Sequence, residues 1–169
     1  LQMLGAGGAA RPAVATLVAS CILVGQMVGM HWKWHFQRAR PAQVYPALTP
    51  VIPTPPHASY PSNHALQSQL ARLALTALFT DAAVRKAVDG ALDALADRIA
   101  TNREVAGVHF QSDTRAGQKL AADILPLLRS TKAYRAVEQE ARAELAGLKA
   151  MGKPLAPAVP RRPAAKGGN

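Results

Sequence analysis

Cysteine and aromatic residues are scarce in this sequence of 169 residues. The single cysteine, Cys21, excludes a disulfide within the chain and a metal site made of several thiolates. Phenylalanine, tryptophan and tyrosine together make up 5% of the residues, so a hydrophobic core must be built from aliphatic side chains. Alanine and leucine are strong helix formers, and their abundance predicts an all-α helical bundle. Cys21 lies in an apolar run, where we expect a small buried residue.

Acidic residues are also few, with 10 Asp and Glu against 20 Lys and Arg, which gives a formal net charge of +10. Such a basic chain suits anionic partners: phosphate esters, nucleic acids or anionic lipids. The sequence contains no zinc-finger, basic-zipper or RNA-binding signature. We therefore expect no nucleic-acid partner and favour a small anionic substrate.

Only one apolar run approaches the length of a membrane span, the uncharged segment 12–30. Polar side chains interrupt it at Thr16, Ser20 and Gln26, and basic residues follow from Lys33 onward. A buried helix of a bundle has the same pattern, and we favour this interpretation over a membrane span or a signal peptide. The sequence thus favours a soluble, periplasmic or secreted protein over a multi-span membrane protein, with membrane association as the less favoured alternative.

Hydrophobic spacing and helix-breaking residues divide the chain into five helices. The predicted helices cover residues 12–39, 62–79, 82–106, 114–128 and 132–149. Between the first two, segment 41–61 contains seven prolines and must be an irregular loop. We assign residues 11–150 to one helical domain, with a flexible segment 1–10 before it and a disordered basic tail at 151–169.

A first cluster of functional interest ends the first predicted helix, with the letters K-W-H-F-Q-R-A-R-P at residues 33–41. Lys33 and Arg40 are seven positions apart, or two helical turns, so in a continuous helix they face the same way. Two cations on one face suit an oxyanion. The alternative is a solvated helix end whose basic residues are favoured by the helix dipole.

A second cluster, Ser62-Asn63-His64, stands at the start of the second predicted helix. The free backbone N–H groups of a first helical turn attract anions. Ser62 can donate its hydroxyl to an anion, or it can simply cap the helix. His64 lies where it can give a proton to a leaving oxygen.

A third cluster contains Arg103, His109 and Asp113. His109 and Asp113 are four positions apart, which is one turn if the segment is helical. A carboxylate beside an imidazole fixes its tautomer and raises its basicity, and the guanidinium of Arg103 is a fork for oxygen ligands. The alternative is a purely structural His–Asp pair.

Together the clusters read K-x6-R-P, P-S-x-H and R-x5-H-x3-D, in this order. This pattern, over residues 33–113, resembles the superfamily of type 2 phosphatidic acid phosphatases, bacterial class A acid phosphatases and vanadium-dependent haloperoxidases. The resemblance implies the helical bundle of that superfamily, with about five helices in this chain. It also implies that Lys33, Arg40 and Arg103 neutralise the oxygens of phosphate or vanadate. Ser62 and the backbone N–H of Asn63 would hydrogen-bond the same anion.

The resemblance assigns the chemistry to three further residues. The residue at the position of His109 attacks phosphorus in the phosphatases and ligates vanadium in the haloperoxidases. Asp113 orients it. His64 protonates the leaving group, or handles the protons of bound peroxide. His57, in the proline-rich loop, resembles the residue that lines the halide side of the pocket in haloperoxidases, although a surface histidine is the alternative.

Two positions depart from the family pattern, which usually has glycine where Asn63 stands and serine where Asn102 stands. Glycine lets the backbone approach an anion closely, so the side chain of Asn63 puts activity in doubt. Haloperoxidases also have more helices before their lysine motif than this chain shows. The domain could therefore be the C-terminal part of a larger one, with an oligomer or complementary helices covering the exposed face.

Three functions are compatible with these residues. We favour a phosphatase-type hydrolase of phosphoric monoesters that acts through a phosphohistidine and needs no cofactor. The alternative is a haloperoxidase that holds vanadate at His109 and oxidises halide with hydrogen peroxide; His57 and the proline-rich loop motivate it. A second alternative is a non-catalytic subunit or scaffold, motivated by Asn63 and Asn102. The substrate itself is not predicted.

Overall fold

The structure, a computed structural model, describes residues 11–150 and contains helices but no strand in that part of the chain. The helices are α1 (Pro12–Phe36), α2 (Pro41–Val44), α3 (Asn63–Thr76), α4 (Ala82–Val105), α5 (Gln111–Ser130) and α6 (Lys132–Ala150). Because α2 is a single turn, the prediction of an all-α bundle with about five helices is confirmed. The flexible segment 1–10 and the basic tail 151–169 of the prediction lie outside the described residues.

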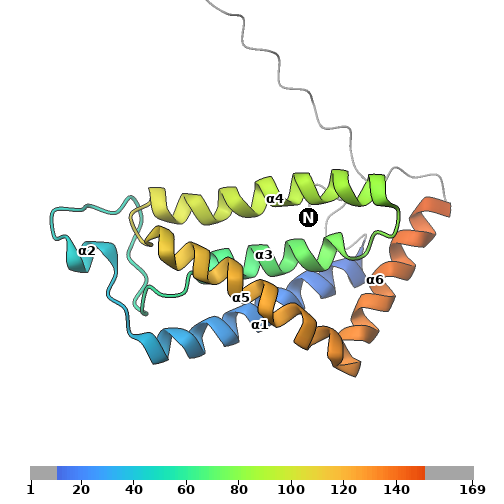
Figure 1. Ribbon diagram of the computed structural model, residues 1–169, viewed down its shortest axis with the longest axis horizontal. Helices are drawn as coiled ribbons and strands as arrows, with labels where there is room; N and C mark the ends of the chain where they lie inside the picture. Colours follow the sequence, from blue (N-terminus) through green and yellow to red (C-terminus); the bar gives the residue numbers. More distant parts are fainter. Residues whose placement is uncertain (1–10, 151–169) are drawn as a thin grey trace, which may run out of the picture.

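Helix α3 occupies the centre of the bundle, with α1, α4 and α5 packed around it (Figure 1). Helix α6 packs across α1 and α5 at the other end from α2. The core is aliphatic, as the composition predicts, and it includes the expected buried cysteine. Its fully buried members include Val14, Leu17, Cys21, Leu66, Leu70 and Ala121. A central α3 is therefore held on three sides, which fixes the position of its first turn.

Two glycines allow neighbouring helices to approach the start of α3 closely. A Cβ atom at Gly117 of α5 would lie 2.5 Å from the carbonyl oxygen of Ser62. A Cβ atom at Gly29 of α1 would overlap the side chain of Asn63. The first turn of α3 is thus clamped between α1 and α5, and no larger residue fits at either glycine without displacement.

Helix α1 ends three residues before the predicted boundary. Gln37 has a φ of 48°, in the left-handed region, and its N–H donates to the carbonyl of Lys33 at 3.0 Å. Pro41 then begins α2, with Arg40 as the residue before its first turn. The prediction that one continuous helix carries Lys33 and Arg40 on a single face is therefore wrong, because the reversal at Gln37 places Arg40 in a separate segment.

Helix α1 buries one narrow stripe and exposes the rest. The buried residues follow helical spacing: Val14, Leu17, Cys21, Gly25, Gly29 and Lys33. Large apolar side chains, among them Leu23 and Met27, face outward. Only 28% of the apolar window of α1 is buried, so the interpretation of this helix as a buried core helix is wrong. By length and composition, α1 is the one described helix that could cross a membrane.

The proline-rich segment 41–61, predicted to be irregular throughout, begins with the single turn of α2 and is irregular only after it. The segment lies at the same end of the bundle as the connection between α4 and α5 (Figure 1). The N–H of Val51 donates to the carbonyl of Ala106 at 3.2 Å. A Cβ atom at Gly107, whose φ is 73°, would lie 3.4 Å from the Cα atom of Pro50. These contacts pin the loop against the α4–α5 connection. The three clusters of the sequence consequently meet at one end of the molecule.

Candidate active site

Lys33 lies in the last turn of α1 and its side chain is fully buried. Its ammonium donates to three backbone carbonyls of the proline-rich loop: Ala58 at 2.8 Å, Ser59 at 2.9 Å and Pro61 at 2.5 Å. An ammonium has three donors, so these contacts use all of them. Lys33 therefore fixes the loop that leads into α3 and places a positive charge behind it.

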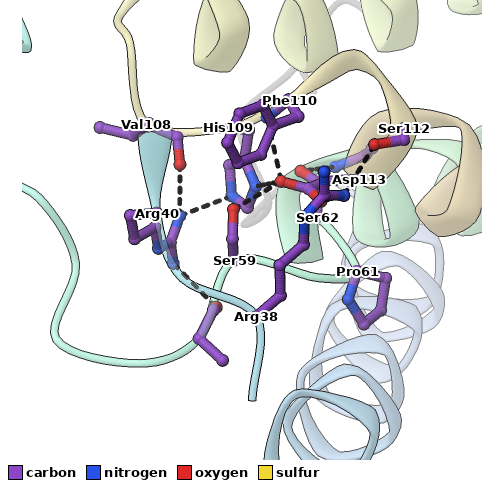
Figure 2. Close-up of polar contacts among 12 residues, drawn as sticks. Arg38, Arg40, Ser59, Pro61, Ser62, Val108, His109, Phe110, Ser112 and Asp113 are labelled. Atoms are coloured by element: carbon purple, nitrogen blue, oxygen red, sulfur yellow. Dashed lines mark hydrogen bonds and ion pairs between the residues drawn. The ribbon is translucent and has the colours of Figure 1, made fainter. Parts of the chain in front are cut away.

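Arg40 is also buried, and its guanidinium connects the loop to the third cluster (Figure 2). Nη1 donates to the carbonyl of Val108 at 2.7 Å and lies 3.0 Å from Nε2 of His109. Nη2 donates to the carbonyl of Ala58 at 3.2 Å, the same oxygen that Lys33 contacts. The two cations thus converge although they come from different segments.

The contacts of His109 assign its tautomer. Arginine is only a donor, so Nε2 of His109 must accept from Arg40 and carries no proton. Nδ1 lies 3.1 Å from Oδ2 of Asp113, an acceptor, and therefore carries the proton. Burial, followed by the charges of Arg40 and Lys33, lowers the pKa of His109 to about 4. The imidazole is neutral near pH 7 and has a lone pair on Nε2.

Asp113 lies in the first turn of α5 and is completely buried. Besides His109, its Oδ2 accepts from the hydroxyl of Ser59 at 2.5 Å and from the N–H of Phe110 at 3.0 Å. Its Oδ1 accepts from Arg38 at 2.8 Å. Burial alone would raise the pKa of Asp113, but these hydrogen bonds and the charge of Arg38 outweigh it and hold the pKa below its usual value. The carboxylate stays ionised.

Ser62 is the N-cap residue of α3, and its hydroxyl oxygen accepts from the N–H of Ala65 at 3.4 Å. Its own N–H donates to the carbonyl of Asp113 at 2.9 Å, which ties the second cluster to the third. The N–H groups of Asn63 and His64 have no hydrogen-bond partner among the described residues. The free amides of this helix terminus form a site where an anion can bind.

The side chain of Asn63 turns toward α1. Its Nδ2 donates to Oε1 of Gln26 at 3.0 Å, and its Oδ1 lies over Gly29 without a hydrogen bond. The amide group therefore occupies space that Gly29 leaves open on α1. The side chain of Asn63 thus contacts α1, and these contacts do not show the expected crowding of the anion.

His64, in the first turn of α3, is exposed at one edge and lines a cavity of about 260 Å³. The protein around the ring desolvates it and lowers its pKa, and the charges of Arg103, Lys33 and Arg40 lower the pKa further. The cavity runs between α1, α3 and α4. Apolar side chains form most of its wall: Val18, Ile22, Ala71, Leu75, Leu92, Leu95, Ala96 and Ile99.

Arg103 stands in the last turn of α4. Its Nε is buried and has no hydrogen-bond partner in the part of the chain that the structure describes. A buried guanidinium nitrogen without an acceptor costs free energy, and an anion near His64 would satisfy it. Of the three predicted cations, Arg103 is the one whose donors are not committed to backbone carbonyls.

His57 is partly buried and contacts Arg40, so it is not simply a surface histidine. Its carbonyl accepts from Nε of Arg40 at 3.0 Å, and its Nδ1 lies 3.1 Å from Nη2 of the same guanidinium. Burial lowers the pKa of His57, and the charges of Lys33 and Arg40 add to this effect. His57 is therefore a neighbour of the candidate anion site, and its role toward a halide stays a prediction.

Two residues at the site, Arg38 and Ser59, were not predicted from the sequence. Both contact Asp113 directly. Arg38 stands within the first cluster, two positions before Arg40, but the expected continuous helix would have turned it away. Ser59 stands three positions before Ser62, and its spacing carries no signal unless the path of the loop is known.

The PAP2 superfamily matches the chain over residues 12–135. The chain belongs to the PAP2 superfamily. No curated protein sequence is similar enough to add to this assignment. Among solved structures, the first transmembrane PAP2 type phosphatidylglycerolphosphate phosphatase from Bacillus subtilis is similar, with a TM-score of 0.58 and 17% identity. The similarity covers 75% of this chain and 70% of that chain and shows a common fold.

These comparisons correct one prediction and leave another without support. The expected soluble, periplasmic or secreted location is wrong, because the similar PAP2 fold is that of a transmembrane phosphatase and α1 exposes an apolar face. Both observations point to membrane association. PAP2 phosphatases need no cofactor, and neither comparison supports vanadate or a haloperoxidase. The chain is therefore a PAP2 superfamily protein with a phosphatase-type fold.

Proposed function

We propose that this PAP2 protein hydrolyses phosphoric monoesters through a phosphohistidine intermediate. The observation that carries the proposal is the state of His109, whose Nε2 lone pair is free of a proton while Asp113 holds the opposite nitrogen. A nucleophile at phosphorus requires a neutral imidazole whose other ring nitrogen is held in place. The amides at the start of α3 and the unsatisfied guanidinium of Arg103 supply the electrostatic complement.

The proposed reaction has two displacements at phosphorus. Phosphate oxygens accept from Arg40, Arg103 and the amides of Asn63 and His64. As they bind, Nη1 of Arg40 turns from Nε2 of His109 to the anion, which releases the lone pair. Nε2 forms a bond to phosphorus while the ester P–O bond breaks, and the leaving oxygen takes a proton from His64. Water then attacks phosphorus, His64 accepts its proton, and the P–N bond breaks to release phosphate.

Lys33 acts in this proposal from behind the loop. Its three donors are on the carbonyls of residues 58, 59 and 61, so it contributes charge and fixes the approach to Ser62. Ser62 keeps the start of α3 in place through its two contacts and offers its hydroxyl to the anion. Charge spread over the equatorial oxygens is then stabilised without a metal ion as partner.

The central test is release of inorganic phosphate from p-nitrophenyl phosphate and a panel of alkyl phosphates by the purified chain in detergent. We expect turnover by the native protein, with loss to background in His109→Ala. His31→Ala, a substitution of an exposed histidine on α1, serves as the matched control and should retain the native rate. A native protein that is folded yet releases no phosphate from any ester would contradict the proposal and favour the non-catalytic alternative.

The apolar cavity beside His64 supports a substrate whose alcohol carries an apolar chain. Since His64 is the proposed donor to the leaving oxygen, the alcohol must start at His64 and extend into the space that this residue lines. Aliphatic side chains in that wall favour an alkyl group over a sugar. The similar Bacillus subtilis protein is a phosphatidylglycerolphosphate phosphatase, which is consistent with a lipid alcohol.

A chain-length series separates this substrate from a small polar ester. We expect kcat/KM to rise from short to long alkyl phosphates, because each methylene placed in the cavity adds about 0.8 kcal/mol of binding. Ala71→Phe fills the cavity and should remove the preference for long chains while leaving short esters unaffected. Ala94→Phe, on the exposed side of α4, is the matched control. If kcat/KM is unchanged along the series, the cavity is not the binding site of the substrate's alkyl chain.

A further inference from the structure

Arg38 lies in the connection between α1 and α2, and its guanidinium reaches the start of α5 (Figure 2). Its Nη1 donates to Oδ1 of Asp113 at 2.8 Å and to the hydroxyl of Ser112 at 2.7 Å. The guanidinium carbon lies 4.3 Å from the centroid of the Phe110 ring, within the range of a cation–π interaction. A residue with no role in the proposed reaction is therefore fixed on the carboxylate that holds His109.

The donors around Asp113 are divided unequally between its two oxygens. Oδ2 accepts from His109, Ser59 and the N–H of Phe110, whereas Oδ1 accepts from Arg38. Arg38 is also the cation in direct ion-pair contact with Asp113 among the described residues. Without it, a fully buried carboxylate would keep its charge and lose the partner of one oxygen. Such a group is held through Oδ2 alone and can turn about that oxygen, which loosens its alignment with Nδ1 of His109.

Two arginines are thus linked to the two ring nitrogens of His109, one directly and the other through Asp113. Arg40 contacts Nε2, the atom that would attack phosphorus. Arg38 acts on the other nitrogen through Asp113. This division separates a residue that would meet the substrate from one that sets the direction of the lone pair.

We propose that Arg38 is a positioning residue for the nucleophile: by fixing the carboxylate of Asp113, it aims Nε2 of His109 at phosphorus. The inference rests on the proposed phosphatase function. It predicts that Arg38 affects the chemical step and not the binding of the ester, because its guanidinium is committed to Asp113 and Ser112.

Steady-state kinetics on an alkyl phosphate separates these effects. We expect Arg38→Gln to lower kcat roughly 10- to 100-fold, since small displacements of a reacting group cost factors of this size. KM should stay within about twofold, because uniform binding is untouched. Arg38→Lys keeps the charge but lacks the planar group that stacks on Phe110. Its kcat should fall between those of the native protein and Arg38→Gln.

Chemical rescue gives a readout that a purely structural role would not change. The side chain of Arg38 is 37% exposed, so a small cation can reach the space that Arg38→Ala leaves. Millimolar guanidinium, far below denaturing concentrations, should raise the kcat of Arg38→Ala, while sodium at equal ionic strength should not. Arg115→Gln is the matched control, because Arg115 is exposed on α5 and contacts Gln111 instead of Asp113. Its kcat should equal that of the native protein.

The outcomes distinguish this inference from the function on which it rests. If the native protein hydrolyses no ester, the proposed function fails and the positioning role fails with it. If the native protein is active and Arg38→Gln keeps its kcat, the positioning role is overturned. A rise in KM with unchanged kcat also overturns it and makes Arg38 a substrate contact. Should Arg38→Gln unfold, the folded Arg38→Lys variant decides: a native kcat in that variant at native KM contradicts the requirement for a planar, stacked guanidinium.

Discussion

At the scale of single residues, the two candidate histidines of the site differ in what surrounds them. His109 is buried between Arg40 and Asp113, and both partners fix it as a neutral imidazole. His64 is exposed at one edge, near several positive charges, and has no fixed hydrogen-bond partner among the described residues. The proposed reaction needs the first ring without a proton on Nε2 and the second ring with one to give.

The pH dependence of kcat/KM follows from these two requirements, because this quantity reports on the free enzyme. His109 must be neutral, so activity falls as the pH drops through its pKa of about 4. His64 must be protonated, so activity falls as the pH rises through its pKa, which lies below the usual histidine value. We expect a bell-shaped profile with its maximum in the acidic range. A profile that keeps rising above neutral pH would contradict the assignment of His64 as the acid.

Replacement of His64 should matter most for poor leaving groups. An alkoxide needs a proton as the P–O bond breaks, whereas p-nitrophenolate leaves without one. For an alkyl phosphate, we expect His64→Ala to lower kcat by roughly 100- to 10,000-fold, the usual contribution of a general acid. For p-nitrophenyl phosphate the loss should be far smaller. Equal losses on both esters would show that His64 binds or positions the substrate instead, and His35→Ala on α1 is the control.

At the scale of elements, the close approach of α1 to α3 explains how Asn63 is tolerated where the family usually has glycine. Gly29 leaves the space, and Gln26 accepts the hydrogen bond from the amide. Neither residue stands near Asn63 in the sequence. The departure from the family pattern is therefore matched by a partner on another helix.

A double-mutant cycle tests this match. Gly29→Ala places a methyl group in the space of the Asn63 amide, and we expect it to lower the free energy of unfolding by about 1–3 kcal/mol, as for other overpacked sites. In an Asn63→Gly background the same change should cost much less, because the clash is gone. Thermal unfolding of the four proteins gives the coupling. Additive effects in the cycle would disprove the contact, and Gly90→Ala, which meets no neighbour, is the control.

The helices could be predicted from local sequence, and the contacts between segments could not. Apolar spacing and the N-cap Asp81 predicted residues 82–106 for α4, which spans 82–105. The end of α1 was missed because a left-handed Gln37 has no reliable local signal. The partners of Lys33 are backbone carbonyls, which every residue offers, so no sequence pattern identifies them. The three clusters lie at one end of the bundle as the resemblance implies, while their roles stay predictions.

At the scale of the whole molecule, the candidate site and the apolar surface have a fixed relation. The site lies near the end of α1, where Lys33 is buried, and the exposed face of the same helix is apolar along much of its length. The cavity beside His64 includes Val18 and Ile22 of α1 in its wall. If this exposed face contacts lipid, the proposed ester with an apolar chain can reach the cavity from the membrane beside α1.

Charges on the outer face of α1 should weaken membrane association without disturbing the site. Leu23 and Met27 are one turn apart and strongly exposed, and neither belongs to the core. On insertion scales an aspartate in the middle of a spanning helix costs about 2.5–3.5 kcal/mol. We expect Leu23→Asp with Met27→Asp to move the protein from the membrane fraction to the soluble fraction, and to reduce its flotation with phospholipid vesicles. Leu127→Asp, an equally exposed position on α5, is the matched control and should stay with the membrane.

Activity measurements on the same variant separate membrane association by the exposed face of α1 from support of the site by its buried stripe. The exposed face of α1 carries large apolar side chains, while its buried stripe includes Lys33, which fixes the loop before Ser62. Turnover of short, soluble alkyl phosphates should therefore persist in the doubly charged variant, because none of the proposed site residues has changed. Turnover of long-chain esters presented in vesicles should fall with the bound fraction. If the variant floats with vesicles as the native protein does, the apolar face of α1 is not the membrane contact, and other surfaces of the bundle must supply it.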